Sequence, residues 1–217
     1  MTTGAGTRRV GQAGRTRELI LVAAERLFAE RGVHAVANRQ ISLAAGQGNN
    51  AAVSYHFGTK TELIRAIVRR HSAQVERIRA GMLADLRDSA DMRELVTCLV
   101  RPIPEHLATL GNPSWYARFC VQMMNDPALN VIVVEEAFNS DAMWELLDRL
   151  RRCMPELPAE VRAERAAMAR HLILHVCAEH ERALAENTPT VRSSWEGTAA
   201  GLIDAIDAVW RAPTRGG

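Results

Sequence analysis

The chain has 217 residues, of which 47% are hydrophobic and 24% charged, proportions that are typical of a globular protein in water. No apolar run approaches the roughly 20 residues of a membrane span, and the four cysteines are widely spaced without a CxxC pair. These features exclude a membrane protein, a disulfide scaffold and a zinc ribbon, and we expect a cytoplasmic protein of one or two domains.

The two parts of the chain differ in charge. Residues 1–80 contain twelve Arg and one Lys against five Glu, whereas residues 81–217 contain fourteen Arg against twenty acidic residues. The first part therefore carries about +8 and the second about −6, within a total of +2. A basic first third indicates a nucleic-acid partner, although solvated helix faces with an uneven tally would give the same count.

Apolar residues recur at intervals of three and four almost throughout, and β-branched runs are short. This period predicts an all-α protein of about nine helices. We expect the first helix to run from near Thr16 to Gly32, after a basic N-terminal arm over residues 1–13 that is flexible or follows a DNA groove.

A helix-turn-helix unit is expected over residues 38–57. Asn38 can cap its first short helix, the glycines at 46 and 48 form the turn, and its second helix ends at Phe57. The spacing of Thr59 and Glu62 indicates a capping box at the start of a long helix. In such a unit the second helix enters the major groove of DNA.

Polar side chains on the second helix are suited to reading base edges. Asn and Gln can pair with adenine, Ser can contact any base, and an Ala methyl can touch thymine. Tyr55, His56 and Lys60 suit phosphate contacts, with packing inside the protein as the alternative for Tyr55 and His56. The predicted DNA-binding residues are Asn38, Arg39, Gln47, Gly48, Asn49, Asn50, Ala51, Ser54, Tyr55, His56, Thr59 and Lys60.

Three motifs occur in order over about residues 15–70: RxLILxAAxxLFAERG from Arg17, ISxAAG from Ile41 and YHFGTKTEL from Tyr55. They resemble the tetracycline-repressor (TetR) family of transcription regulators, in a branch whose recognition helix reads AAxxYHFGSK. Thr59 and Lys60 match the phosphate-contacting positions of that family. The turn is one residue longer than is usual there, which leaves open which of Gln47, Asn49 and Asn50 reaches a base.

The resemblance implies a DNA-binding domain over residues 14–75 and a helical domain over residues 76–217 that binds an effector and dimerises. Aromatic and Met side chains at helical spacing suit a pocket for an apolar or planar molecule, although such a stripe is also ordinary core. The predicted pocket residues are Trp115, Phe119, Met123, Phe138, Met143, Trp144 and His175. The predicted dimer residues are Leu172, Ile173, Val176, Leu202, Ile203, Ile206 and Val209, which burial within one subunit would also explain.

The sequence therefore predicts a homodimeric transcription regulator that binds a palindromic operator in double-stranded DNA as a repressor and is released by an unidentified small-molecule effector. No catalytic motif, metal-ligand set or cofactor fingerprint is present, so we expect neither enzyme activity nor a cofactor. His171 and His175, four residues apart, keep a metal sensor open. Control by a protein partner remains a further alternative.

Overall fold

The computed structural model describes residues 4–87, 91–154 and 156–213. Within these ranges it consists of eleven α-helices joined by turns and loops, with no β-strand, which confirms the all-α prediction. The number exceeds nine partly because the segment around Pro102 forms two helices instead of one kinked helix: α5 (Met92–Val100) ends and α6 (Pro102–Thr109) begins there.

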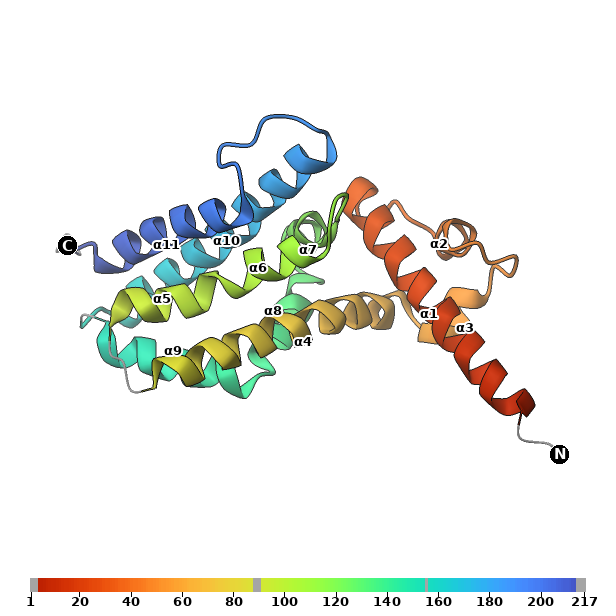
Figure 1. The fold of residues 1–217 in the computed structure, drawn as a ribbon, viewed down its shortest axis with the longest axis horizontal. Coiled ribbons are helices and arrows are strands. Elements are labelled where there is room, and N and C mark those ends of the chain that lie inside the picture. The colour runs from red at the N-terminus through yellow and green to blue at the C-terminus, as the bar shows by residue number, and fades with distance from the viewer. Residues whose placement is uncertain (1–3, 88–90, 155, 214–217) are drawn as a thin grey trace.

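The first three helices form one end of the molecule (Figure 1). They are α1 (Gly4–Arg31), α2 (Asn38–Ala44) and α3 (Ala52–Phe57). Phe28, Ile41 and Val53 are fully buried between them, and Ala45 lets α2 and α3 approach closely. Helix α1 begins well before Thr16, so residues 4–13 of the predicted arm are helical, while residues 1–3 lie outside the described residues.

Helix α4 (Lys60–Leu86) connects this end to the rest of the chain. The Thr59 hydroxyl oxygen accepts a hydrogen bond from the Glu62 backbone N–H at 3.1 Å, which is one half of the predicted capping box. The Glu62 carboxylate lies 3.9 Å from the Arg65 guanidinium. The first part of α4 buries Leu63 and Ile67 against the N-terminal helices, and its later turns run along the C-terminal helices (Figure 1). One rigid helix therefore belongs to both halves of the molecule.

The C-terminal half is a helical bundle with the later turns of α4 along one side (Figure 1). Beyond α5 and α6 it contains α7 (Tyr116–Met124), α8 (Asn130–Phe138), α9 (Asp141–Cys153), α10 (Ala159–Ala185) and α11 (Trp195–Arg211). Helix α7 packs against both α10 and α1, while α8 and α9 pack against α4. In the described part of the chain, no helix combines the length and apolar character needed to cross a membrane.

Four of the predicted dimer residues are buried within one subunit. Leu202, Ile203 and Ile206 are at most 4% exposed, because the apolar face of α11 packs on α5 and α6. Ile173 is likewise buried, at 5% exposed. Burial within the subunit accounts for these four residues, since helical periodicity identifies an apolar face but not what covers it. Leu172, Val176 and Val209 remain half-buried.

Candidate DNA-binding face and effector cavity

The turn between α2 and α3 is held by its own side chains. The Asn49 Oδ1 atom accepts a hydrogen bond from the Ala51 N–H at 2.8 Å, and the Gln47 Nε2 atom donates to the Ala45 carbonyl at 3.0 Å. Such local bonds replace the helix contacts that a glycine-containing turn lacks. Gln47 and Asn49 therefore already have a structural role in the free protein.

A second group of side chains faces the solvent. Asn50 is exposed, and within the described residues its side-chain amide makes no hydrogen bond. Ser54 is exposed, Tyr55 is 82% exposed, and half-buried His56 meets the Tyr55 ring edge-on at 5.0 Å. We call Asn50, Ser54, Tyr55 and His56 the reading face. The neighbouring Gly48 and Ala51 contribute no polar side-chain atom.

The side chain of Lys60 lies differently from the prediction. Its ammonium donates to the carbonyls of Val36 at 2.7 Å and Val33 at 3.2 Å, both in the loop between α1 and α2. The lone lysine therefore uses at least two of its three N–H groups to fix this loop. The resemblance to the family matched the position of Lys60, but it could not show that the Val33 and Val36 carbonyls of the same chain bind its ammonium.

Asn38 is not the cap of α2. Ala37 occupies the N-cap position, and the Gln40 Oε1 atom accepts its backbone N–H at 2.7 Å. Asn38 is the first helical residue, and its Oδ1 atom is buried without a hydrogen-bond partner among the described residues. The neighbouring Arg39 is exposed, as a DNA contact requires.

The C-terminal half encloses a cavity of about 220 Å³. Its wall is mainly apolar and comes from α4 to α11, with Ile103, Leu107 and Val133 as examples. Two predicted pocket residues, Phe138 and Met143, line it, and so does Ile173. The lining also includes the polar residues Ser72, Glu76, Arg79, Tyr116 and Arg170.

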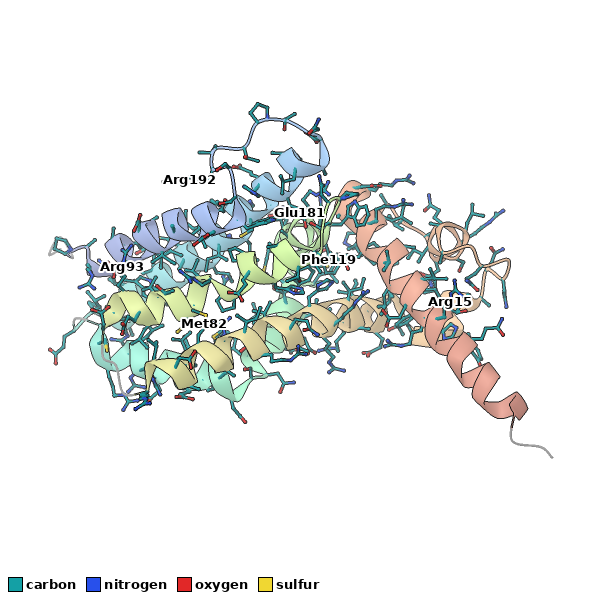
Figure 2. All side chains as sticks on the ribbon, in the orientation of Figure 1. Arg15, Met82, Arg93, Phe119, Glu181 and Arg192 are labelled. Carbon is teal, nitrogen blue, oxygen red and sulfur yellow. The ribbon has the colours of Figure 1, made fainter. Side chains whose placement is uncertain are left out.

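The other five predicted pocket residues lie outside the cavity wall. Phe119 and Met123 are fully buried because α7 turns this face toward α1, where the Phe119 ring stacks on Phe28 at 6.3 Å (Figure 2). Trp115 is half-buried beside the core, Trp144 is 59% exposed, and His175 is exposed. The face of α7 that carries Phe119 and Met123 is therefore part of the hydrophobic core between the N-terminal and C-terminal halves of the chain.

One ion pair in the cavity wall is buried and has further hydrogen-bond partners within the protein. The Arg79 side chain is 2% exposed, and its Nε atom lies 3.1 Å from the Glu76 carboxylate. The same guanidinium donates to the Cys98 carbonyl at 2.6 Å and the Leu99 carbonyl at 3.1 Å. The Ser140 hydroxyl donates to Glu76 at 2.5 Å. These bonds tie α4 to α5 and α9 around the cavity.

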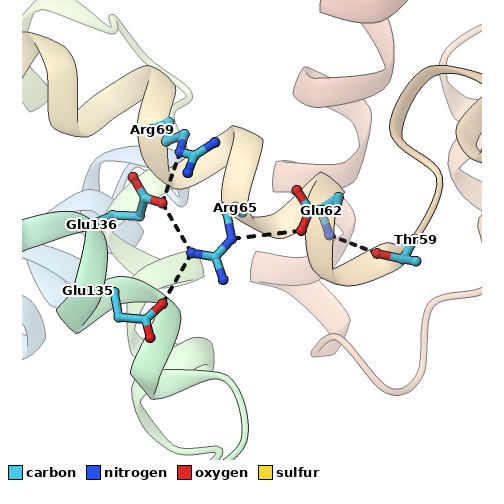
Figure 3. A network of polar contacts seen from close by, with 6 residues as sticks. All are labelled: Thr59, Glu62, Arg65, Arg69, Glu135 and Glu136. Carbon is cyan, nitrogen blue, oxygen red and sulfur yellow. Dashed lines mark hydrogen bonds and ion pairs between the residues drawn. The ribbon is translucent and has the colours of Figure 1, made fainter. Parts of the chain in front are cut away.

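Helix α8 connects the cavity to the start of α4 (Figure 3). Arg65 on α4 reaches Glu135 and Glu136 at 3.2 Å each, and Arg69 reaches Glu136 at 2.9 Å. Hydrogen bonds to Glu135 and Glu136 raise the pKa of the Arg65 guanidinium. Val133 of the same helix lines the cavity, so α8 contacts both the cavity and the helix that leads to the DNA-binding end.

A buried polar chain forms a second connection. The His71 Nε2 atom lies 2.9 Å from the Glu25 carboxylate of α1, and its Nδ1 atom lies 2.8 Å from His106 Nε2 of α6. Tyr116, which lines the cavity, stacks on the His71 ring at 3.8 Å. Burial, with smaller contributions from His71 and Arg70, lowers the pKa of His106 to about 4.

The sequence analysis did not identify this chain of residues. The available signal was the presence of polar residues, Glu25 and His71, at positions of the helical period that should be buried. A similar signal would have found Glu181 on α10, which is 1% exposed and accepts hydrogen bonds from Ser114 and from the backbone N–H groups at the start of α7 (Figure 2).

The histidine pair of α10 has no third metal ligand beside it in the described part of the chain. His171 and His175 lie near each other on α10 with ring centres 6.0 Å apart, and both are exposed. No group of three or more His, Cys, Asp or Glu side chains among the described residues could hold a metal ion.

Two family comparisons cover most of the chain. Residues 20–67 match the family of bacterial regulatory proteins described as the tetR family, and residues 97–208 match the tetracyclin repressor-like C-terminal domain. The chain belongs to the TetR family and is a helix-turn-helix DNA-binding transcription regulator. No curated protein matches it.

Solved structures of similar fold include a TetR-family regulator from Marinobacter aquaeolei, 16% identical, with a TM-score of 0.56 over 92% of this chain and 96% of that one. The multidrug binding protein EbrR, solved with imidazole, is 18% identical with a TM-score of 0.51 over 92% and 97%. PfmR from Thermus thermophilus is 16% identical with a TM-score of 0.50 over 92% and 97%. At these identities the likeness supports the fold alone.

Proposed function

We propose that the protein is a homodimeric repressor that binds an inverted-repeat operator and is released by a small, largely apolar effector. The observation that carries this proposal is the double role of α8, which lines the cavity and forms ion pairs with the helix leading to the DNA-binding end. EbrR is a multidrug binding protein of similar fold, which is compatible with an apolar ligand here.

The reading face supplies the base contacts in this proposal. Each subunit places α3 in a major groove, where the Asn50 amide can donate to and accept from one adenine edge. Ser54 can contact a second base, and Tyr55 and His56 suit the flanking phosphates. Gln47 and Asn49 hold the turn that orients α3.

The outer surface of α10 is the proposed dimer surface. Met168 is 44% exposed, and Leu172 and Val176 are half-buried along the same helix. With α11 packed beside it, α10 of each subunit would pair with its antiparallel copy and so complete a four-helix bundle. This assignment keeps Leu172 and Val176 from the predicted set and adds Met168. It leaves out the α11 residues that are buried inside the subunit.

The effector acts through the two connections between the cavity and the DNA-binding end. Displacement of α8 moves Arg65 and Arg69 on α4, and displacement of Tyr116 moves the ring stack on His71. Either movement changes the separation of the two reading faces in the dimer. An effector shifts DNA affinity only by as much as it prefers one arrangement over the other.

Selection from random duplex DNA at physiological salt tests the proposal. We expect enrichment of an inverted repeat whose half-sites lie about 34–36 Å apart or a multiple of that distance. Sedimentation of the complex should show an even number of subunits per operator. Weak, salt-sensitive binding without any enriched repeat would contradict the proposal.

A further inference from the structure

Arg170 is a second arginine in the cavity wall, and its surroundings differ from those of Arg79. It lies on α10, and its buried Nε atom has no hydrogen-bond partner in the part of the chain that the structure describes. Arg170 is half-buried as a whole, and no ion pair or hydrogen bond joins its side chain to another described residue. Arg79, in the same wall, has a carboxylate and two carbonyls as partners. Buried donors in proteins are ordinarily hydrogen-bonded, so the unbonded Nε atom leaves this half-buried guanidinium available to a partner from outside the chain.

The remaining ionisable groups of the wall leave this charge uncompensated. Glu76 and Arg79 neutralise each other. Burial raises the pKa of Tyr116 well above its usual range and the pKa of Cys120 to about 12, so both side chains are neutral. Burial also raises the pKa of Cys177. The cavity is therefore an apolar chamber with one net positive charge at Arg170.

We propose that the cavity takes a small monoanionic amphiphile whose carboxylate pairs with Arg170. This inference rests on the proposed function and names the chemical class of its effector. The guanidinium offers a fork of N–H donors that matches a carboxylate, and charge-assisted bonds of this kind are about twice as strong as neutral ones. The apolar body of the ligand packs among Ile103, Phe138 and Met143. The volume of about 220 Å³ suits a medium-chain or a simple aromatic acid.

Calorimetric titration of the full-length protein with octanoate and with octanol tests this assignment. The two probes share the same chain length and differ in charge. We expect the wild-type protein to bind octanoate about tenfold more tightly than octanol, the factor expected from one charge-assisted pair. Equal affinities, a preference for octanol, or no binding of either probe would overturn the proposal.

Two variants test whether Arg170 causes the preference for octanoate over octanol. Arg170→Gln should bind both probes equally, with the octanol affinity unchanged. Arg182→Gln is the matched control, since Arg182 is an arginine on the same helix outside the cavity wall, and it should keep the preference. A preference that survives in Arg170→Gln overturns the assignment. If this variant does not fold, the wild-type comparison of the two probes decides alone.

The proposed function is tested separately in the same preparation. Failure to select an inverted repeat, combined with a clear octanoate preference, would contradict the operator proposal and leave the ligand class standing. Selection of an inverted repeat without any octanoate preference would contradict the ligand class and leave the operator proposal standing.

Discussion

The reading face and the cavity place chemically similar side chains in opposite situations. On the turn before α3, Asn49 is bonded to its own backbone, whereas the exposed Asn50 amide has no bond within the described residues. In the cavity wall, Arg79 is bonded to Glu76 and to two backbone carbonyls, whereas the Arg170 side chain has no partner in the described part of the chain. Residue type alone does not separate these roles. The bonded member of each pair holds the protein's own structure, and we propose that the other member contacts a ligand.

The largest effect is expected at the bonded arginine. Arg79→Met would leave the Glu76 carboxylate and two carbonyls without their donor, at a cost of about 3–5 kcal/mol in the free energy of unfolding. Urea unfolding measures this loss. Arg77→Met is the control, because Arg77 is an exposed residue that donates to Gln74 on its own helix. Similar losses in both variants would show that the buried network does not hold the cavity wall.

A smaller effect follows from His106. Since its pKa is lowered to about 4 in the folded protein, the unfolded chain binds the proton first as pH falls below 6.5. Stability should therefore be full above pH 6.5 and fall by at most about 3 kcal/mol as the pH approaches 4. His71, Glu25 and Tyr116 surround this group in the same buried network.

His106→Gln removes this titration and should flatten the pH dependence of unfolding between pH 6.5 and 4. The comparison uses urea unfolding of both proteins across this range. Parallel pH curves for the wild type and the variant would mean that His106 does not carry the effect.

Lys60 distinguishes a scaffold role from a DNA contact. Loss of its bonds to the Val33 and Val36 carbonyls in Lys60→Met should lower the free energy of unfolding by about 1–2 kcal/mol. If the ammonium stays on these carbonyls in the complex, the salt dependence of DNA binding should keep its slope. A slope that falls by about one would instead establish the phosphate contact that the sequence predicts.

The smallest effect is expected at Arg69. Its side chain is 58% exposed, and Arg65 also reaches Glu136. Arg69→Ala should therefore change the free energy of unfolding by less than about 1 kcal/mol. A loss of several kcal/mol by urea unfolding would show that this ion pair, and not packing, holds α8 on α4.

The N-terminal half could be predicted because its signals are local. The apolar period of α1, the Thr59 cap and the glycine-containing turn each depend on residues a few positions apart. The cavity depends on contacts between distant segments, so its stripe of aromatic residues on α7 was placed in the wrong environment. Phe138 and Met143 were found, whereas Arg170 and the Glu25–His71–His106 chain required the three-dimensional structure.

Parallel DNA selections with the wild type, Asn50→Ala and Asn49→Ala test the central claim most directly. We predict that Asn50→Ala loses preference at one base pair of each half-site, equivalent to about 1–3 kcal/mol. Asn49→Ala should keep the sequence preference and bind all sites more weakly, because the turn loses a bond worth about 1 kcal/mol. Loss of base preference in Asn49→Ala, with Asn50→Ala unchanged, would contradict the assignment of the reading face.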